Sequence, residues 1–223
     1  MEPLPKEIEC FNNLSGWRLH FAWLRLSEGE HEAVLRMASE AAVTLFKRKF
    51  SDNSYSNDPT VRSVHSLLMS SGLPKEKCLT SFDLLAQRVL SGNGIRPQKP
   101  GVVFRDLLSL KYMVPWSIMD IVQVRFPVTF RMGREEETLS QDGNDFSLKG
   151  CPVLCDEAGK LRTPITLADE DEIAGSCGDI LFVCYAPVER AREVAAKSHV
   201  GSMVHMTQAF RFVMERAFLP KGR

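Results

Sequence analysis

A complete helix signal lies at residues 80–92, which are Thr80-Ser81-Phe82-Asp83-Leu84-Leu85-Ala86-Gln87-Arg88-Val89-Leu90-Ser91-Gly92. Thr80 and Asp83 form a capping-box-like pair, in which each side chain accepts a hydrogen bond from the other residue's backbone N–H. Apolar residues follow at helical spacing until Gly92, which tolerates the left-handed backbone common at helix ends. The segment therefore predicts a helix with defined ends.

Similar signals lie on the N-terminal side of this helix. Asp58-Pro59 supplies a cap and a first-turn proline for a helix that ends at Gly72. Further upstream, residues 17–26 alternate in polarity as a half-buried strand does, and residues 34–49 have helical spacing. The basic cluster Lys47-Arg48-Lys49 suits the carbonyl end of that helix.

On the C-terminal side, residues 102–112 have helical spacing, and short β-type runs begin after Asp120. The expected strands are residues 128–131, 146–148, 152–155 and 180–185. Helices followed by strands predict an α+β fold in which helices pack on a mainly antiparallel sheet. We expect a single domain over residues 1–223, with an N-terminal strand-helix extension, a core and a C-terminal helical segment, at 1–58, 59–187 and 188–223 respectively.

Composition limits the partners of this chain. It has 223 residues, of which 44% are hydrophobic and 25% are charged, and its 28 Lys and Arg balance its 28 Asp and Glu. No long-range positive field is available to collect nucleic acid, so we expect no DNA partner, and any RNA contact is local. Its apolar runs are shorter than the roughly 20 residues that span a bilayer. We expect a cytoplasmic protein without a membrane partner.

Several enzyme classes lack their minimum motifs. The chain has no Gly-rich phosphate loop, no His-Glu-x-x-His helix and no Gly-x-Ser-x-Gly elbow. Cys151 and Cys155 have a ligand-like interval but no matching second pair, which favours core cysteines over a zinc site. We therefore expect no cofactor and no metal, and no catalytic residue is assigned.

Five segments appear in an order typical of a known family. They are residues 80–92, Ile95-Arg96-Pro97, residues 107–115 followed by Asp120, residues 129–136, and Leu181-Phe182-Val183-Cys184-Tyr185-Ala186-Pro187. Together they span somewhat more than half of the chain. In this order the segment from Pro59 to Pro187 resembles the B3/B4 domain of the phenylalanyl-tRNA synthetase beta subunit, and particularly the free-standing proteins built around that domain.

The resemblance implies an α+β domain that holds an editing pocket for the acylated end of a tRNA. In the family, tyrosine wrongly attached to the phenylalanine tRNA is removed there by ester hydrolysis. This chain departs from the family at several positions. Lys99 and Val103 replace an asparagine and an aspartate, Asp106 replaces a second asparagine, and Ser117 replaces a histidine. The family's Gly-Gly-Glu segment has no counterpart in residues 167–178.

The candidate site residues have two interpretations each. Asp106 and Asp120 would fix an α-amino group or a water, or would cap helices and turns. Ser117 would donate to a substrate, or it would be a loop hydroxyl bonded to the backbone. Arg131 and Glu136 are the other substrate-binding candidates. Arg131 would contact a carboxyl or phosphate, or would pair with Glu136 or Glu137. Separately, the basic residues Arg96 and Lys99 are candidates for phosphate contact, against simple surface charge.

Three functions remain open from the sequence. The first is a free-standing tRNA- or RNA-binding protein that takes the acceptor end of a tRNA or an aminoacyl-adenosine-like ligand, with hydrolysis of mischarged aminoacyl-tRNA in trans. As an enzyme it would be an aminoacyl-tRNA deacylase, since no ATP-binding domain for ligation is present. The second is a non-catalytic binding module for an amino-acid-like ligand or RNA that has lost the editing residues. The third is a small-molecule enzyme on the same scaffold. The first leads us to expect a cleft between helices and sheet near Ser117, Asp120 and Arg131. The oligomeric state is open.

Overall fold

A four-stranded antiparallel sheet runs through the middle of the molecule, which a computed structural model describes at residues 7–50, 54–96, 99–141, 144–159, 161–165, 178–190 and 196–220. Its strand order is β10-β2-β9-β3. The strands are β2 (Trp17–Leu26), β3 (Trp116–Asp120), β9 (Asp179–Pro187) and β10 (Phe210–Phe218). All nine residues of β9 are buried, because the strand is covered on both faces.

A smaller sheet has the order β1-β4-β7-β8. Its strands are β1 (Cys10–Asn12), β4 (Val128–Met132), β7 (Pro152–Cys155) and β8 (Leu161–Arg162). β1 pairs with β4 in parallel, and the other pairs are antiparallel. A separate hairpin consists of β5 (Thr138–Gln141) and β6 (Asn144–Ser147).

Five α-helices and four short 3-10 helices are described. The α-helices are α1 (Glu32–Lys49), α2 (Pro59–Ser70), α3 (Ser81–Leu90), α4 (Pro100–Tyr112) and α5 (Ala196–Thr207). The short helices are η1 (Ser54–Asn57), η2 (Lys75–Lys77), η3 (Ile121–Gln123) and η4 (Val188–Arg190).

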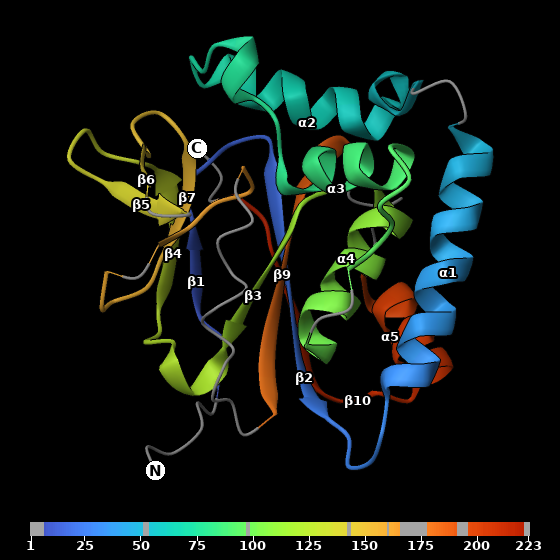
Figure 1. Cartoon of the computed structure of the whole chain (residues 1–223). Helices are drawn as coiled ribbons and strands as arrows, with labels where there is room; N and C mark the ends of the chain where they lie inside the picture. Colours follow the sequence, from blue (N-terminus) through green and yellow to red (C-terminus); the bar gives the residue numbers. More distant parts are fainter. Residues whose placement is uncertain are drawn as a thin grey trace.

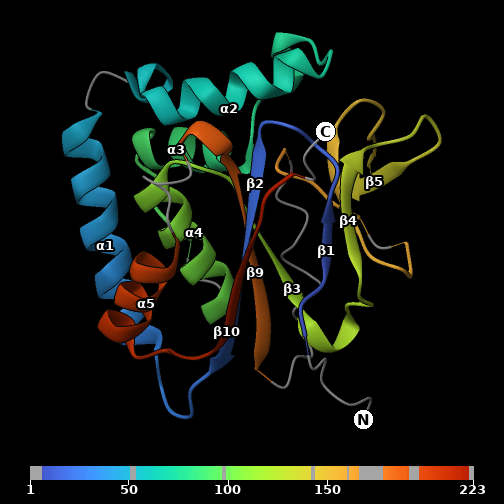
Figure 2. The ribbon, with the colours of Figure 1, turned by 180° about the vertical axis from the view of Figure 1, so that it is seen from behind.

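The elements form three layers, with the main sheet in the middle. Helices α1, α3, α4 and α5 lie on one side of it, and the smaller sheet lies on the other (Figures 1 and 2). On the helical side, Phe104 of α4 packs on Phe182 of β9, with ring centroids 5.5 Å apart. On the opposite side, Tyr185 of β9 packs on Phe130 of β4 at 5.6 Å. The main sheet therefore contributes one face to each of two apolar layers.

The local sequence signals set the ends of the helices as expected. Thr80 and Asp83 form a complete capping box at the start of α3. Asp58 caps α2, whose backbone N–H at Thr60 donates to the aspartate over 3.0 Å, and Pro59 is the first helical residue. The predicted strand at 17–26 coincides with β2, and the one at 152–155 coincides with β7. The α+β prediction, with helices packed on a mainly antiparallel sheet, is confirmed.

The prediction of a helical segment over residues 188–223 is correct only in part. Residues 196–207 form α5, but residues 210–218 form β10, which pairs with β2 along its open edge. Gln208 has a left-handed backbone with φ of 51°, which ends the helical path. Phe210 then packs against Phe104 at 4.8 Å, so sheet pairing and aromatic packing override the helical spacing. Residues 191–195 and 221–223 of this segment lie outside the described residues.

The described part of the N-terminal segment at 1–58 contributes to all three layers, because β1 belongs to the smaller sheet, α1 lies on the helical side and β2 belongs to the main sheet (Figures 1 and 2). Its strand β2 lies between β9 and β10, and residues Trp17 to Arg25 pair with Pro187 to Asp179.

In the described part of the chain, no helix combines the length and the apolar character that crossing a membrane requires.

Candidate functional site

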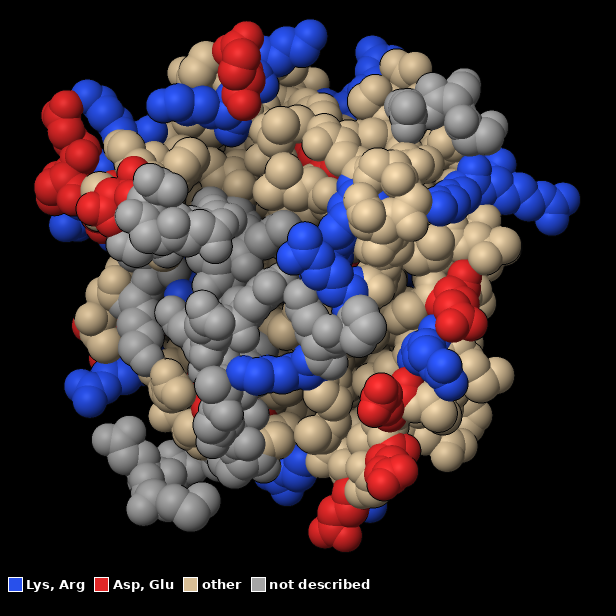
Figure 3. Space-filling view, in the orientation of Figure 1, with Lys and Arg blue, Asp and Glu red and all other residues tan. Residues whose placement is uncertain are grey.

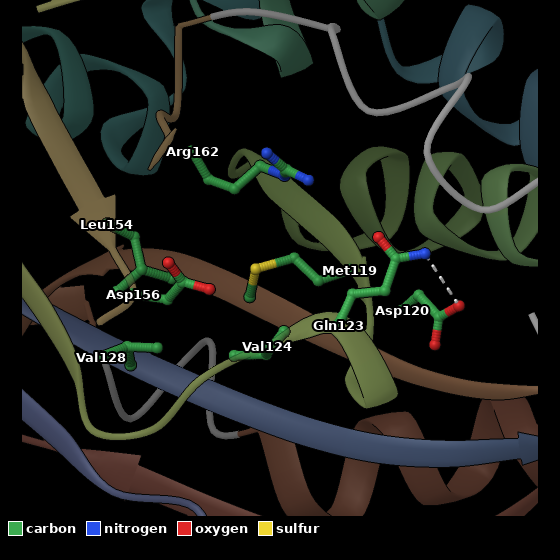
Figure 4. Close-up of a pocket in the computed structure, with 8 residues that line it drawn as sticks. All are labelled: Met119, Asp120, Gln123, Val124, Val128, Leu154, Asp156 and Arg162. Atoms are coloured by element: carbon green, nitrogen blue, oxygen red, sulfur yellow. Dashed lines mark hydrogen bonds between the residues drawn. The ribbon is translucent and has the colours of Figure 1, made fainter. Parts of the chain in front are cut away.

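A small polar pocket lies where the end of β3 meets the smaller sheet. It contains Asp120, one of the predicted site residues, and collects side chains from β3, η3, β4, β7 and β8 (Figure 4). The residues that line it are Met119, Asp120, Gln123, Val124, Val128, Leu154, Asp156 and Arg162.

Asp120 is held by the turn that follows β3. One carboxylate oxygen accepts a hydrogen bond from the backbone N–H of Val122 over 3.2 Å, so Asp120 caps η3. The other oxygen accepts from Nε2 of Gln123 at 3.5 Å, which is the dashed contact in Figure 4. The capping interpretation of Asp120 is thus confirmed, and the same carboxylate, only 4% exposed, also lines the pocket.

The smaller sheet contributes a second carboxylate and a guanidinium. Asp156 directly follows β7, and its Oδ2 accepts from the backbone N–H of Arg125 at 3.2 Å. Arg162 lies in β8, where it pairs in register with Leu154 of β7. Both side chains belong to buried residues, with exposures of 7% and 6%. In Figure 4 they come from one side of the pocket, and Asp120 and Gln123 come from the other.

The pocket is narrow. Its free space measures about 10 Å³ for the centre of a water molecule, which is room for about one water. Two carboxylates can accept hydrogen bonds from that water, while a guanidinium and an amide can donate to an oxygen that gains negative charge. Apolar side chains such as Val124 and Leu154 complete its wall. Chemically, the arrangement suits an oriented water beside a polarised carbonyl.

Asp106 lies elsewhere, in an ion-pair cluster of α3 and α4. It is 3% exposed, and its Oδ2 accepts from Nη2 of Arg88 at 3.0 Å. Its Oδ1 accepts from Nε and Nη2 of Arg105 at 3.1 and 2.8 Å. The carboxylate therefore neutralises two guanidinium groups inside the helical layer.

Ser117 is also buried within the protein. It lies on β3 opposite Val183 of β9, and it is 1% exposed. The Tyr185 hydroxyl donates to its Oγ over 3.1 Å. The hydroxyl therefore bonds to the protein, but it lies on a strand and its partner is a side chain, whereas a loop hydroxyl bonded to the backbone was expected.

Arg131 pairs with one of its two expected partners, Glu137. Its Nη1 and Nη2 donate to the two oxygens of Glu137 at 2.9 and 2.6 Å, which is a bidentate ion pair. Glu136 is exposed. Hydrogen bonding by Arg131, supported by the backbone N–H of Arg134, lowers the pKa of the Glu137 carboxyl to about 2.

The Glu137 pair predicts a pH-dependent part of the stability. A carboxyl group whose pKa is lower in the folded than in the unfolded state stabilises the fold fully above its unfolded-state pKa. This stabilisation is lost as the pH falls through the folded-state pKa. We therefore expect Glu137→Gln to cost about 1 kcal/mol near neutral pH. The difference from the natural chain should shrink between about pH 4.5 and pH 2. Urea unfolding at several pH values measures this, and a difference that is constant over that range would refute the assignment.

The two phosphate-contact candidates are exposed near the start of α4. Arg96 lines a wide hollow of about 920 Å³ between α1 and the α4 N-terminus, together with Glu32, Arg36 and Glu40. Lys99 is the residue before α4, and its side chain makes no capping bond. Because the hollow contains residues of both charges, its walls do not favour a polyanion by charge alone.

Charge on the visible surface is equally mixed. Lys and Arg side chains lie in separate groups on the face shown in Figure 3, and several adjoin Asp or Glu. The distribution in Figure 3 agrees with the balanced composition.

The structure does not bring the predicted site residues together. Ser117 and Arg131 do not line the pocket that contains Asp120. The space between α4 and the main sheet, where the cleft was expected, is filled by rings including Phe104, Phe182 and Phe210. The pocket lies instead next to the smaller sheet, because the apolar faces of α4 and β9 close tightly on each other.

Sequence reasoning missed Gln123, Asp156 and Arg162. A signal was present for one of them, since Asp156 directly follows a predicted strand, where polar side chains gather at a sheet edge. Residues 167–177, where the family's Gly-Gly-Glu segment was sought, lie outside the described residues. Among the described residues, no group of three or more His, Cys, Asp or Glu could hold a metal ion. Cys151 and Cys155 are free thiols, buried and half-buried respectively.

The sequence was compared with known proteins. No protein-family model matches it, and no curated protein matches it either.

Proposed function

We propose that this chain is a free-standing protein of the B3/B4 type that binds the acylated 3′ end of a tRNA and hydrolyses a wrongly attached amino acid. The observation that carries the proposal is the pocket at the end of β3, where two buried carboxylates, Asp120 and Asp156, share a water-sized space with Arg162. The order of family-like segments from Pro59 to Pro187 supports the substrate class.

In the proposed reaction the aminoacyl ester lies at the mouth of the pocket, and a water lies inside it. The water oxygen attacks the ester carbonyl while its proton passes to a carboxylate, for which Asp120 and Asp156 are the candidates. The carbonyl oxygen gains negative charge, which Arg162 stabilises by donating hydrogen bonds. The bond to the ribose oxygen then breaks, and that oxygen takes the proton back. The products are a free amino acid and an uncharged tRNA.

Binding relies on short-range contacts. A protein with balanced charge gains little from the phosphate backbone of the tRNA body, so only the terminal nucleotides and the amino acid need to be contacted. Arg96 and Lys99 are exposed and available for phosphate contact at the start of α4. In this proposal, another protein, such as a synthetase, holds the tRNA body.

A deacylation assay tests the proposal. Purified protein is incubated with a panel of correctly and incorrectly charged tRNAs, and release of the labelled amino acid is followed. We expect turnover of at least one mischarged tRNA, and Asp120→Asn should lower kcat/KM by about 100-fold because it removes a proton acceptor. Asparagine still accepts the Val122 hydrogen bond, so the fold is kept. Glu136→Gln, an exposed change of the same kind, is the matched control and should have no effect.

A non-catalytic binding module is the second candidate. It is favoured by Ser117, which stands where the family has a histidine and whose hydroxyl is bonded to Tyr185. Saturable binding that prefers acylated over free tRNA, without turnover, would support this candidate. Equal affinity for acylated and free tRNA would contradict both.

A further inference from the structure

A second cavity, unrelated to the pocket at Asp120, lies on the helical side of the molecule. It has a volume of about 390 Å³, which falls within the range of small-molecule sites. Its walls are α1, the C-terminal part of α4 and α5, three helices that lie side by side in Figures 1 and 2. We call it the three-helix groove.

The lining of the three-helix groove is almost entirely apolar. Alanines on α1, including Ala38, Ala41 and Ala42, keep the backbone of that helix close to the cavity and leave room in front of it. Leucine, phenylalanine and methionine side chains form the rest of the wall, and methionine adapts easily to the shape of an apolar ligand. Leu45 and Met206 remain 65% and 58% exposed at its rim. Such exposure is costly in water and favours a bound apolar group.

Among the described lining residues, two have polar side chains, Lys49 and Lys111. Lys49 is already paired, since its Nζ lies 3.3 Å from Oδ2 of Asp58. Lys111 donates to the neutral Ser202 hydroxyl over 3.2 Å and has no carboxylate partner among the described residues. Partial burial lowers the pKa of the Lys111 ammonium, so it gains from a nearby anion. In the described part of the chain, the groove thus combines a long apolar surface with one ammonium group that has no carboxylate partner, although it also lies 5.7 Å from the centroid of the Tyr112 ring.

We propose that the three-helix groove binds a medium-chain fatty carboxylate, with its chain along the alanine face of α1 and its carboxylate at Lys111. A neutral apolar molecule would leave the Lys111 charge uncompensated. An acidic amphipathic helix would bring several charges to a rim where, among the described residues, Lys111 is the one lysine without a carboxylate partner. One negative charge on an unbranched chain matches both the charge and the apolar surface.

Binding of decanoate to the full chain, measured by titration calorimetry, tests the proposal. We expect saturable binding with a Kd below about 1 mM. Octanoate, which is two methylenes shorter, should bind about fifteenfold more weakly. Lys111→Met should weaken decanoate binding about tenfold, because it removes a charged hydrogen bond, and should leave decanol binding unchanged. Lys47→Met is the matched control on α1, outside the groove, and should bind decanoate normally.

Two substitutions at exposed positions fill or charge the groove. Ala41→Trp, which fills the groove, should abolish binding of both decanoate and decanol. Leu45→Glu, which places a negative charge at the rim, should abolish decanoate binding, and it tests the groove even if the Ala41→Trp variant does not fold. Equal binding of decanoate by the Lys111→Met variant and the natural chain would overturn the proposal. So would the absence of saturable binding, or a dimer in light scattering that Leu45→Glu dissociates, since a second copy would then occupy the groove.

Discussion

Replacing Phe104 with alanine should lower the free energy of unfolding by about 3–5 kcal/mol, because a large ring is removed from a tightly packed core. The side chain is completely buried, and its ring lies 5.5 Å from that of Phe182 and 4.8 Å from that of Phe210. It therefore joins α4 to two strands of the main sheet at once. Urea unfolding followed by far-UV circular dichroism measures the loss.

A control for this experiment lies on β10. Phe212 is 40% exposed, so Phe212→Ala removes an equal ring from a partly solvated position and should cost about 1 kcal/mol. If Phe104→Ala were no more destabilising than Phe212→Ala, the rings between α4 and the sheet would not form the packed layer described above.

Removing the carboxylate of Asp106 should also cost about 3–5 kcal/mol, because it breaks the ion pairs that this buried carboxylate makes with Arg88 and Arg105. Arg105 is only 1% exposed and donates two hydrogen bonds to Asp106. Asp106→Ala is therefore expected to destabilise far more than Glu136→Ala, which removes an exposed carboxylate. Chemical denaturation of both variants provides the measurement.

A triple variant separates charge from packing at this cluster. Arg88→Met, Arg105→Met and Asp106→Leu together replace the three charged groups by apolar groups and should recover much of the lost stability, since such replacements are often neutral. The conservative variant Asp106→Asn addresses function. A fully stable Asp106→Asn protein that had lost deacylation would show that Asp106 belongs to the site, contrary to the structural role assigned to it here.

Sequence reasoning located elements that have local signals at their ends. The capping box at Thr80 and Asp83 sets the start of α3, and the alternation of Trp17 to Leu26 identifies β2, because both patterns arise from neighbouring residues. β3 was missed because all five of its residues are buried, so the strand shows no alternation. β10 was mistaken for helix because its pairing with β2 is a long-range contact.

Only part of the candidate site could be predicted from the sequence, because long-range contacts also bring some of its residues together. Asp120 could be selected because a family-like segment leads up to it. Gln123 lies in η3, three residues after Asp120, whereas Asp156 and Arg162 come from later segments and meet Asp120 only because the smaller sheet packs beside β3. Ser117 and Arg131 were reasonable candidates by residue type. In the structure, however, the Ser117 hydroxyl accepts a hydrogen bond from Tyr185, and Arg131 forms an ion pair with Glu137.

The position of β2 between β9 and β10 has a consequence for synthesis of the protein on the ribosome. β2 emerges early, yet both of its partners come from residues 179–187 and 210–218. At a translation rate of about 5–20 residues per second, the nascent strand waits on the order of ten seconds with two unpaired edges and several aromatic side chains uncovered. Nascent chains halted before residue 179 should therefore recruit chaperones strongly, and this demand should fall once β10 has left the exit tunnel.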